Sequence, residues 1–195
     1  MRIKVLLILL FIVSFQLCHA QKGIEKLTRY KIDSLQHIRV DTILYYCSYC
    51  GECSIRGQKH TCYLASGYTL SDNIIIYKQH GRFYTLSFDC SNTSIKKQLD
   101  SCRSIPYFIS IISTLDARDK AIKLIYKQKQ FLPPIVIDGS SATAEIYYNR
   151  KRQSASINLD MPQDLVETWN YYFWFKKETN LFKLIKTDLD KTNTN

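Results

Sequence analysis

Four cysteines and one histidine lie close together in the segment YYCSYCGECSIRGQKHTC, which covers residues 45–62. They are Cys47, Cys50, Cys53, His60 and Cys62. Side chains of these types bind zinc, hold iron–sulfur clusters, exchange disulfides or form structural disulfide bridges. The spacing of the five residues and the compartment of the chain decide which of these chemistries the sequence favours.

A zinc site is the first interpretation, because thiolates and an imidazole can complete the tetrahedral coordination of zinc. Structural zinc sites typically take their ligands as two pairs separated by a longer spacer. Here three cysteines crowd the short segment 47–53, and the remaining ligand is a single residue, either His60 or Cys62. The match is partial, so zinc stays the alternative interpretation of this segment.

Iron–sulfur and redox chemistry fit the segment less well. The run C-x2-C-x2-C begins like a bacterial ferredoxin motif, but Cys62 follows Cys53 only after eight residues and no proline comes after it. CSYC and CGEC are both dithiols, yet Glu52 would raise the thiol pKa and neither motif opens an expected helix. The spacing therefore favours both interpretations less than zinc or disulfides.

The first residues predict that the chain is exported. Arg2 and Lys4 precede an almost unbroken apolar run over residues 5–17, and Cys18 and Ala20 are small residues at the −3 and −1 positions of a cleavage site. This layout is typical of a signal peptide over residues 1–20, because a spanning helix needs about 20 apolar residues. An uncleaved anchor and a lipid attachment at Cys18 are the alternatives. We expect the mature chain in the periplasm or outside the cell, without a transmembrane span.

Export favours structural disulfides over a metal. One of the seven cysteines, Cys18, leaves with the signal peptide, so an even number remains in an oxidising compartment. The candidates for disulfide bridges are Cys47, Cys50, Cys53, Cys62, Cys90 and Cys102. Fifteen pairings are compatible with six cysteines. We expect Cys90 to pair with Cys102, which ties a strand to a helix, and Cys47 to pair with Cys62.

Hydrophobic patterns predict a helix over residues 22–38, a strand over 41–47 and two β-hairpins. The first hairpin covers residues 73–89 and turns at His80–Gly81. The second covers residues 143–159 and turns at Asn149–Lys151. Within the first hairpin, Phe88 is expected to be a core residue.

Further helices are expected in the second half of the chain. Residues 93–102 predict a helix with Thr93 or Ser94 as its N-cap, which Pro106 breaks. Residues 107–128 continue as helix, and residues 161–189 predict a C-terminal helix before a polar tail, 191–195. The inward positions of that last helix are Leu165, Trp169, Phe173, Phe182, Ile185 and Leu189. Because helices and hairpins are segregated, the sequence predicts one α+β domain over residues 21–190, an antiparallel sheet with helices packed on it.

The sequence indicates no particular activity. The net charge of +10 arises from scattered basic residues without a nucleic-acid-binding signature, so we expect no nucleic-acid partner. An anionic surface is one partner that the basic charge allows. We expect a non-enzymatic module that binds a protein or envelope component. The alternatives are a zinc- or thiol-dependent enzyme built on residues 47–62, or a secreted effector or immunity-type protein.

Overall fold

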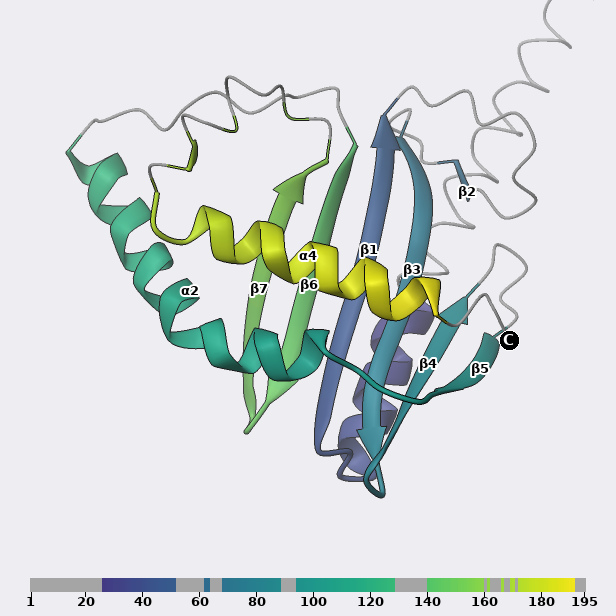
Figure 1. Cartoon of the computed structure of the whole chain (residues 1–195). Helices are drawn as coiled ribbons and strands as arrows, with labels where there is room; N and C mark the ends of the chain where they lie inside the picture. Colours follow the sequence, from purple (N-terminus) through teal and green to yellow (C-terminus); the bar gives the residue numbers. More distant parts are fainter. Residues whose placement is uncertain are drawn as a thin grey trace, which may run out of the picture.

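The computed structural model describes residues 26–51, 62–63, 68–88, 94–128, 140–159, 161, 166, 169–170 and 172–191. In this part of the chain six strands form an antiparallel sheet in the order β5-β4-β3-β1-β6-β7, and a short strand, β2, pairs with β3 beside this path (Figure 1). The strands are β1 (Thr42–Gly51), β2 (Cys62–Tyr63), β3 (Tyr68–Gln79), β4 (Arg82–Phe88), β5 (Ser94–Leu99), β6 (Ser141–Tyr148) and β7 (Lys151–Asn158). The fold is α+β, which confirms the predicted class.

Both predicted hairpins are confirmed. Strands β3 and β4 join through His80 and Gly81, with φ of 50° and 77°, and β6 and β7 join through Asn149 and Arg150, with φ of 49° and 61°. Two consecutive positive φ values are typical of the type I′ turn, whose twist matches that of the flanking strands. Each hairpin therefore has its register fixed by a two-residue turn.

Helices cover both faces of the sheet (Figure 1). Helices α2 (Ser104–Lys127) and α4 (Phe175–Asp190) pack on one face, and the N-terminal helix, described over residues 26–37, lies on the other. Strand β1 contributes to both layers because its side chains alternate. Leu44 and Tyr46 join the core beneath α2 and α4, whereas Ile43, Tyr45 and Cys47 pack with the N-terminal helix.

A charged network fixes the N-terminal helix to the sheet. Both guanidinium nitrogens of Arg29 donate to the carboxylate of Glu145 on β6, at 2.5 and 2.8 Å, and Tyr147 and Arg152 donate to the same carboxylate. Burial alone would raise the pKa of Glu145, but the hydrogen bonds from Arg29, Arg152 and Tyr147 outweigh it and lower the pKa to about 2. The network thus holds a carboxylate ionised inside a largely apolar interface.

The helix predicted over residues 93–102 is wrong. Residues 94–99 form β5 at the edge of the sheet, and α2 begins only at Ser104, with Pro106 in its first turn. Proline is tolerated there because the first N–H groups of a helix have no intrahelical acceptor. The N–H groups at the start of α2 find their acceptor on α4. Asp188 Oδ2 accepts from the backbone N–H of Arg103 and of Ser104, at 2.9 and 2.8 Å.

The predicted C-terminal helix is longer than the observed one. Helix α4 begins at Phe175, and the residues before it make a turn that places Trp169, Trp174 and Phe175 in one cluster beside the second half of α2. In a continuous helix Trp169 and Trp174 would lie about 140° apart, so they could not share this cluster. The expectation that Phe173 points inward is wrong, because this side chain is 55% exposed.

Side chains cover the exposed edge of β7 at its centre. The backbone N–H of Ser154 donates to Gln153 Oε1, and its carbonyl oxygen accepts from Arg118 Nη2 on α2, both at 2.9 Å. Arg118 also pairs with Glu178 of α4 and with Asp119. This arginine therefore links α2, α4 and the last strand. No described helix is long and apolar enough to cross a membrane.

Candidate functional site

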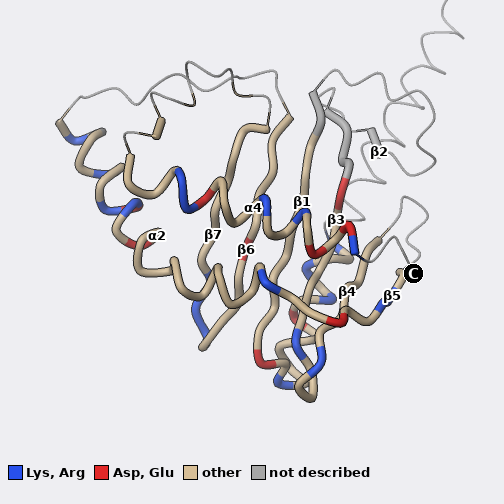
Figure 2. The backbone as a smooth tube through the Cα atoms, viewed as in Figure 1, with Lys and Arg blue, Asp and Glu red and all other residues tan. Residues whose placement is uncertain are grey.

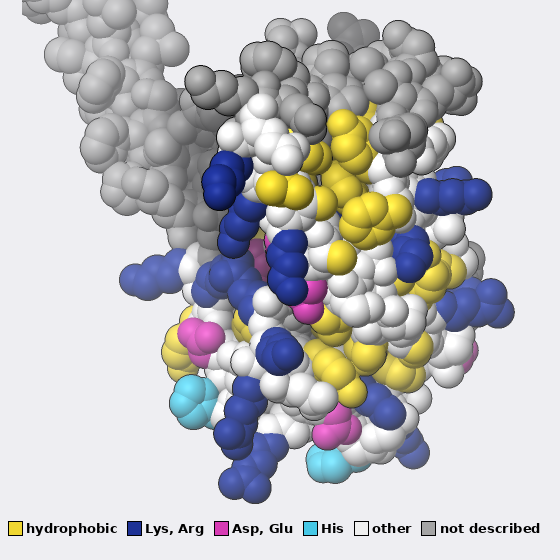
Figure 3. Space-filling view, turned by 90° about the vertical axis from the view of Figure 1, so that its left-hand side faces the viewer, with side chains coloured by type: hydrophobic (Ala, Val, Ile, Leu, Met, Phe, Trp, Pro, Cys, Tyr) yellow, Lys and Arg dark blue, Asp and Glu magenta, His cyan; other side chains and the backbone are white. Residues whose placement is uncertain are grey.

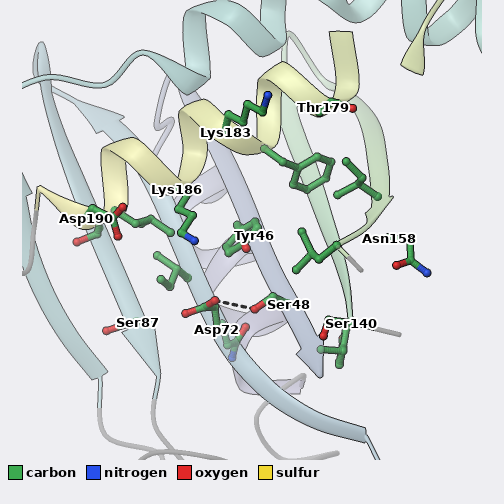
Figure 4. A pocket seen from close by; sticks show the side chains of 18 of the residues that line it. Tyr46, Ser48, Asp72, Ser87, Ser140, Asn158, Thr179, Lys183, Lys186 and Asp190 are labelled. Carbon is green, nitrogen blue, oxygen red and sulfur yellow. Dashed lines mark hydrogen bonds between the residues drawn. The ribbon is translucent and has the colours of Figure 1, made fainter. Parts of the chain in front are cut away.

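A cavity among the described residues lies between α4 and the sheet (Figure 4). Its volume is about 960 Å³, and we call it the α4 groove. The residues that line it come from five strands and α4, with Ser140 and residues 159, 161 and 166. They are Tyr46, Ser48, Tyr49, Asp72, Asn73, Ile74, Thr85, Ser87, Phe88, Ile95, Lys97, Ser140, Ile157, Asn158, Leu159, Met161, Val166, Phe175, Thr179, Phe182, Lys183, Lys186, Leu189 and Asp190.

The path of α4 explains why a groove exists. This helix packs against α2 and β7 and then crosses in front of β6, β1 and β3 (Figure 1). Residues 178, 181, 185 and 188 are buried at helical spacing, and the neighbouring stripe of Thr179, Phe182, Lys186 and Leu189 lies over the groove. One stripe of α4 is thus buried in the core, and the adjacent stripe lines the groove.

A polar chain forms the floor of the groove. Ser48 Oγ on β1 donates to Asp72 Oδ2 on β3 at 2.6 Å, and Tyr46 stands two residues earlier on the same face of β1. Burial, followed by the negative charge of Asp72, raises the pKa of Tyr46 to about 12, while a hydrogen bond with Ser48 opposes this shift. At neutral pH the floor therefore presents a neutral phenol next to a carboxylate that Ser48 already engages.

A β-bulge lies beside this floor. Ser48 pairs with Asp72 and the next residue, Tyr49, pairs with Leu70, so Ser71 is an extra residue in β3. Bulges redirect the side chains around them and are frequent next to binding sites. Here the bulge interrupts the β1–β3 ladder next to Asp72, which is the carboxylate of the floor.

The charges of the groove are unequal on its two sides. Two lysines of α4, Lys183 and Lys186, and Lys97 of β5 line it, together with Asp72 and Asp190. Figure 4 shows the side chain of Lys186 directed from α4 toward the floor. Within the described part of the chain Lys186 makes no ion pair and no hydrogen bond. It is the cation best placed to meet an acidic group inside the groove.

The predicted cysteine site is only partly described. Cys47 lies on a strand as expected, but β1 runs on to Gly51, so Cys50 also lies on the strand and not in the loop expected after residue 47. Cys47 is buried on the face of the N-terminal helix, away from the α4 groove. Cys53 and His60 lie outside the described residues. No group of three metal-binding side chains occurs among the residues that the structure describes, and the zinc interpretation stays untested.

The structure bears differently on the two expected disulfide pairs. Cys102 is a buried thiol whose Sγ lies 3.4 Å from Ser104 Oγ, and Cys90 lies outside the described residues, so this pairing stays a prediction. For the other pair, Cys62 of β2 is opposite Leu70, and Leu70 is opposite Tyr49 of β1. Strand β3 thus separates Cys62 from β1 by about 10 Å, whereas a disulfide needs Cα atoms within about 7 Å. The strand register argues against a Cys47–Cys62 bridge.

A smaller cavity of about 410 Å³ lies on the opposite face, beside the N-terminal helix. Arg29, Tyr45, Cys47 and Glu145 are among the residues that line it. Burial, with a further contribution from Cys47, raises the pKa of Tyr45, so the phenol stays neutral. Because Arg29 is already engaged by Glu145, this cavity offers fewer unused polar groups than the α4 groove.

The sequence did not single out the residues of the α4 groove. Ser48 directly follows the predicted strand 41–47, Asp72 directly precedes the first predicted hairpin, and Lys183 and Lys186 resemble ordinary solvated positions of a helix. The only usable signal was the helical spacing of Thr179, Lys183 and Lys186 beside the apolar stripe. A scan against models of known protein families gives no match, and a search of curated proteins gives none either.

Proposed function

We propose that the chain is an exported, non-enzymatic binding protein that takes an amphipathic acidic molecule into the α4 groove. The observation that carries this proposal is the groove itself, a cavity of about 960 Å³ that combines an apolar lining with Lys186, a cation without an ion pair in the described part of the chain. Binding cavities for small molecules usually measure about 300–1,000 Å³ and combine apolar walls with a few polar groups.

The apolar part of the ligand would lie along the walls. Half of the lining residues are aliphatic or aromatic, and they come from both sides of the groove, with Ile74 and Ile157 on the sheet and Phe182 on α4. An acyl chain or a comparable apolar body would remove this surface from water, at about 25 cal/mol per Å² of apolar area. Apolar burial supplies the affinity, and the polar groups fix the orientation.

The acidic part of the ligand would lie on the α4 side. Asp72 repels an anion near the floor, whereas Lys186 attracts one from the opposite wall. The protonated phenol of Tyr46 could donate a hydrogen bond to a neutral oxygen of the ligand. This division of charge predicts a ligand whose acidic group points toward α4.

The groove supports binding better than catalysis. Ser48 and Asp72 form a hydrogen-bonded pair, but a serine nucleophile needs a base that can accept its proton, most often histidine. His37 and His80, the two histidines among the described residues, lie at the opposite end of the sheet. The zinc- or thiol-dependent enzyme and the effector or immunity-type protein stay predictions, because no feature of the described residues favours either.

Binding of a dansyl-labelled long-chain fatty acid tests the proposal. We expect saturable fluorescence enhancement with one site per chain. The Lys186→Met variant should bind about tenfold more weakly, because a charged hydrogen bond contributes about 1.5 kcal/mol or more. Lys176→Met is the matched control, since Lys176 is an exposed residue of α4 that does not line the groove.

A neutral fatty alcohol provides the second arm, by displacement of the dansyl probe. The wild-type protein should prefer the acid, and Lys186→Met should bind acid and alcohol alike. Absence of saturable binding, or equal losses in Lys186→Met and Lys176→Met, would contradict the proposed ligand site.

A further inference from the structure

The two hairpin turns and the connection from the N-terminal helix to β1 lie at one end of the sheet. We call this the turn end and define it as residues 37–42, 78–83, 99–100 and 148–152. The strand register brings these segments together, because Lys78 pairs with Thr42, Thr42 pairs with Tyr148, and Tyr148 pairs with Lys151. They form one row across β3, β1, β6 and β7.

The turn end is basic. Within the described part of the chain, five of its cations are not paired with a carboxylate, namely Arg39, Lys78, Arg82, Arg150 and Lys151, whereas Arg152 is engaged by Glu145. Two exposed carboxylates, Asp41 and Asp100, lie at the same end and offset part of this charge. Figure 2 shows the Lys and Arg positions of the turns at the lower end of the molecule, and Figure 3 shows Lys, Arg and His side chains at the lower end of the face of α2 and β7.

The backbone holds these cations in place. His80, Gly81, Asn149 and Arg150 have positive φ in two tight turns, and Arg39 has a φ of 55° at the end of the N-terminal helix. Tight two-residue turns between paired strands have little conformational freedom. The basic groups therefore project from a preformed end of the sheet, and docking would cost little ordering of the backbone.

An exposed apolar side chain lies among the cations. Ile38 is 58% exposed and directly precedes Arg39. A lone exposed isoleucine is common on protein surfaces, but its position within a basic end resembles the combination that holds proteins at anionic bilayers. Cations attract the headgroups, and the apolar side chain enters the boundary with the acyl chains.

We propose that the turn end docks on an anionic lipid surface. The charge of the end favours an anionic partner, and Ile38 favours a lipid surface over a purely polar polyanion. Ser48 and Asp72 of the α4 groove lie six residues along β1 and β3 from the Thr42–Lys78 pair, which corresponds to about 20 Å. The docked chain would thus hold the Ser48–Asp72 floor of the groove about 20 Å from the turn end. This inference does not depend on the identity of the groove ligand.

Co-sedimentation of the mature chain, from residue 21, with lipid vesicles tests the proposal. We expect binding to vesicles of 30% phosphatidylglycerol and 70% phosphatidylcholine, and none to pure phosphatidylcholine. The Arg82→Gln/Lys151→Gln variant should bind about 30-fold more weakly, because each basic residue near an anionic surface contributes about one kcal/mol. Sodium chloride at 0.5 M should abolish binding by screening.

Two further variants keep the test specific. Lys120→Gln/Lys123→Gln removes the same charge from exposed positions of α2 and should leave vesicle binding nearly unchanged. Ile38→Ser should weaken binding to anionic vesicles but not binding to dextran sulfate. Three results would each overturn the proposal: equal losses in the two charge variants, binding to pure phosphatidylcholine, or unchanged vesicle binding of Ile38→Ser. The last result would indicate a polyanion as the partner.

Discussion

Replacement of Glu145 by glutamine removes the charge at the centre of the network that holds the N-terminal helix, while it keeps the shape of the side chain. The pKa of Glu145 falls from its ordinary value of 4.5 to about 2 in the folded chain. Each unit of pKa shift corresponds to about 1.4 kcal/mol, so the shift sets a ceiling of about 3 kcal/mol. Arg29 and Arg152 are 44% and 57% exposed, and water screens them. We therefore expect Glu145→Gln to lower the free energy of unfolding by about 2 kcal/mol at pH 7.

The sign of the pH dependence follows from the lowered pKa. The ionised carboxylate stabilises the fold fully above the pKa of the unfolded chain, and this contribution is lost as the pH falls from 4.5 toward 2. Urea denaturation of wild type and variant at pH 7, 5 and 3 measures the free energy of unfolding, and urea is chosen because it adds no ionic strength. Their stabilities should differ at pH 7 and approach each other at pH 3. Asp100→Asn removes an exposed carboxylate and serves as the control. An equal difference at pH 3 and pH 7 would refute the electrostatic reasoning.

Two further predictions concern β4 and the buried arginine. Leu86→Ala should lower the free energy of unfolding by about 2–4 kcal/mol and Phe88→Ala by only about 1–2 kcal/mol, because Leu86 is 5% exposed whereas Phe88 is only partly buried. Urea denaturation measures both losses, and a larger loss for Phe88→Ala would contradict this reasoning. Arg118→Met should cost about 2–4 kcal/mol at pH 8. Burial raises the pKa of Glu178 to about 7, although Arg118 opposes this shift. Without Arg118 the buried carboxyl group is harder to ionise, so the variant should lose stability as the pH rises from 5 to 8. A stability of the variant that rose with pH would refute this reasoning.

Local patterns in the sequence predicted the hairpins but not every helix. His80–Gly81 and Asn149–Arg150 stand between alternating runs, and such turns depend on a few adjacent residues. Thr93 and Ser94 are candidate N-caps and predict a helix from this point, but pairing with β4 makes residues 94–99 an edge strand. The acceptor for the first turn of α2 comes from Asp188, a residue 84 positions away from Ser104, which no local pattern could reveal.

The α4 groove was not predicted because it depends on the position of one helix relative to the sheet. Ser48 and Asp72 lie 24 residues apart in the sequence and meet only through the register of β1 and β3. Lys186 belongs to the groove because α4 crosses β1 and β3, and the amphipathic pattern of α4 does not specify its crossing direction. The cysteines were easy to recognise in the sequence, but their types did not indicate where the α4 groove lies.

The covered edge of β7 limits how this protein can recognise a partner. A peptide that extends a sheet must exchange hydrogen bonds with alternate residues of the edge strand. At the centre of β7 both backbone groups of Ser154 are already bonded to Gln153 and Arg118, and release of Arg118 would also separate it from the buried Glu178. Strand addition at this edge would therefore dismantle the junction of α2 and α4. The same arrangement protects the chain against edge-to-edge association with its own copies.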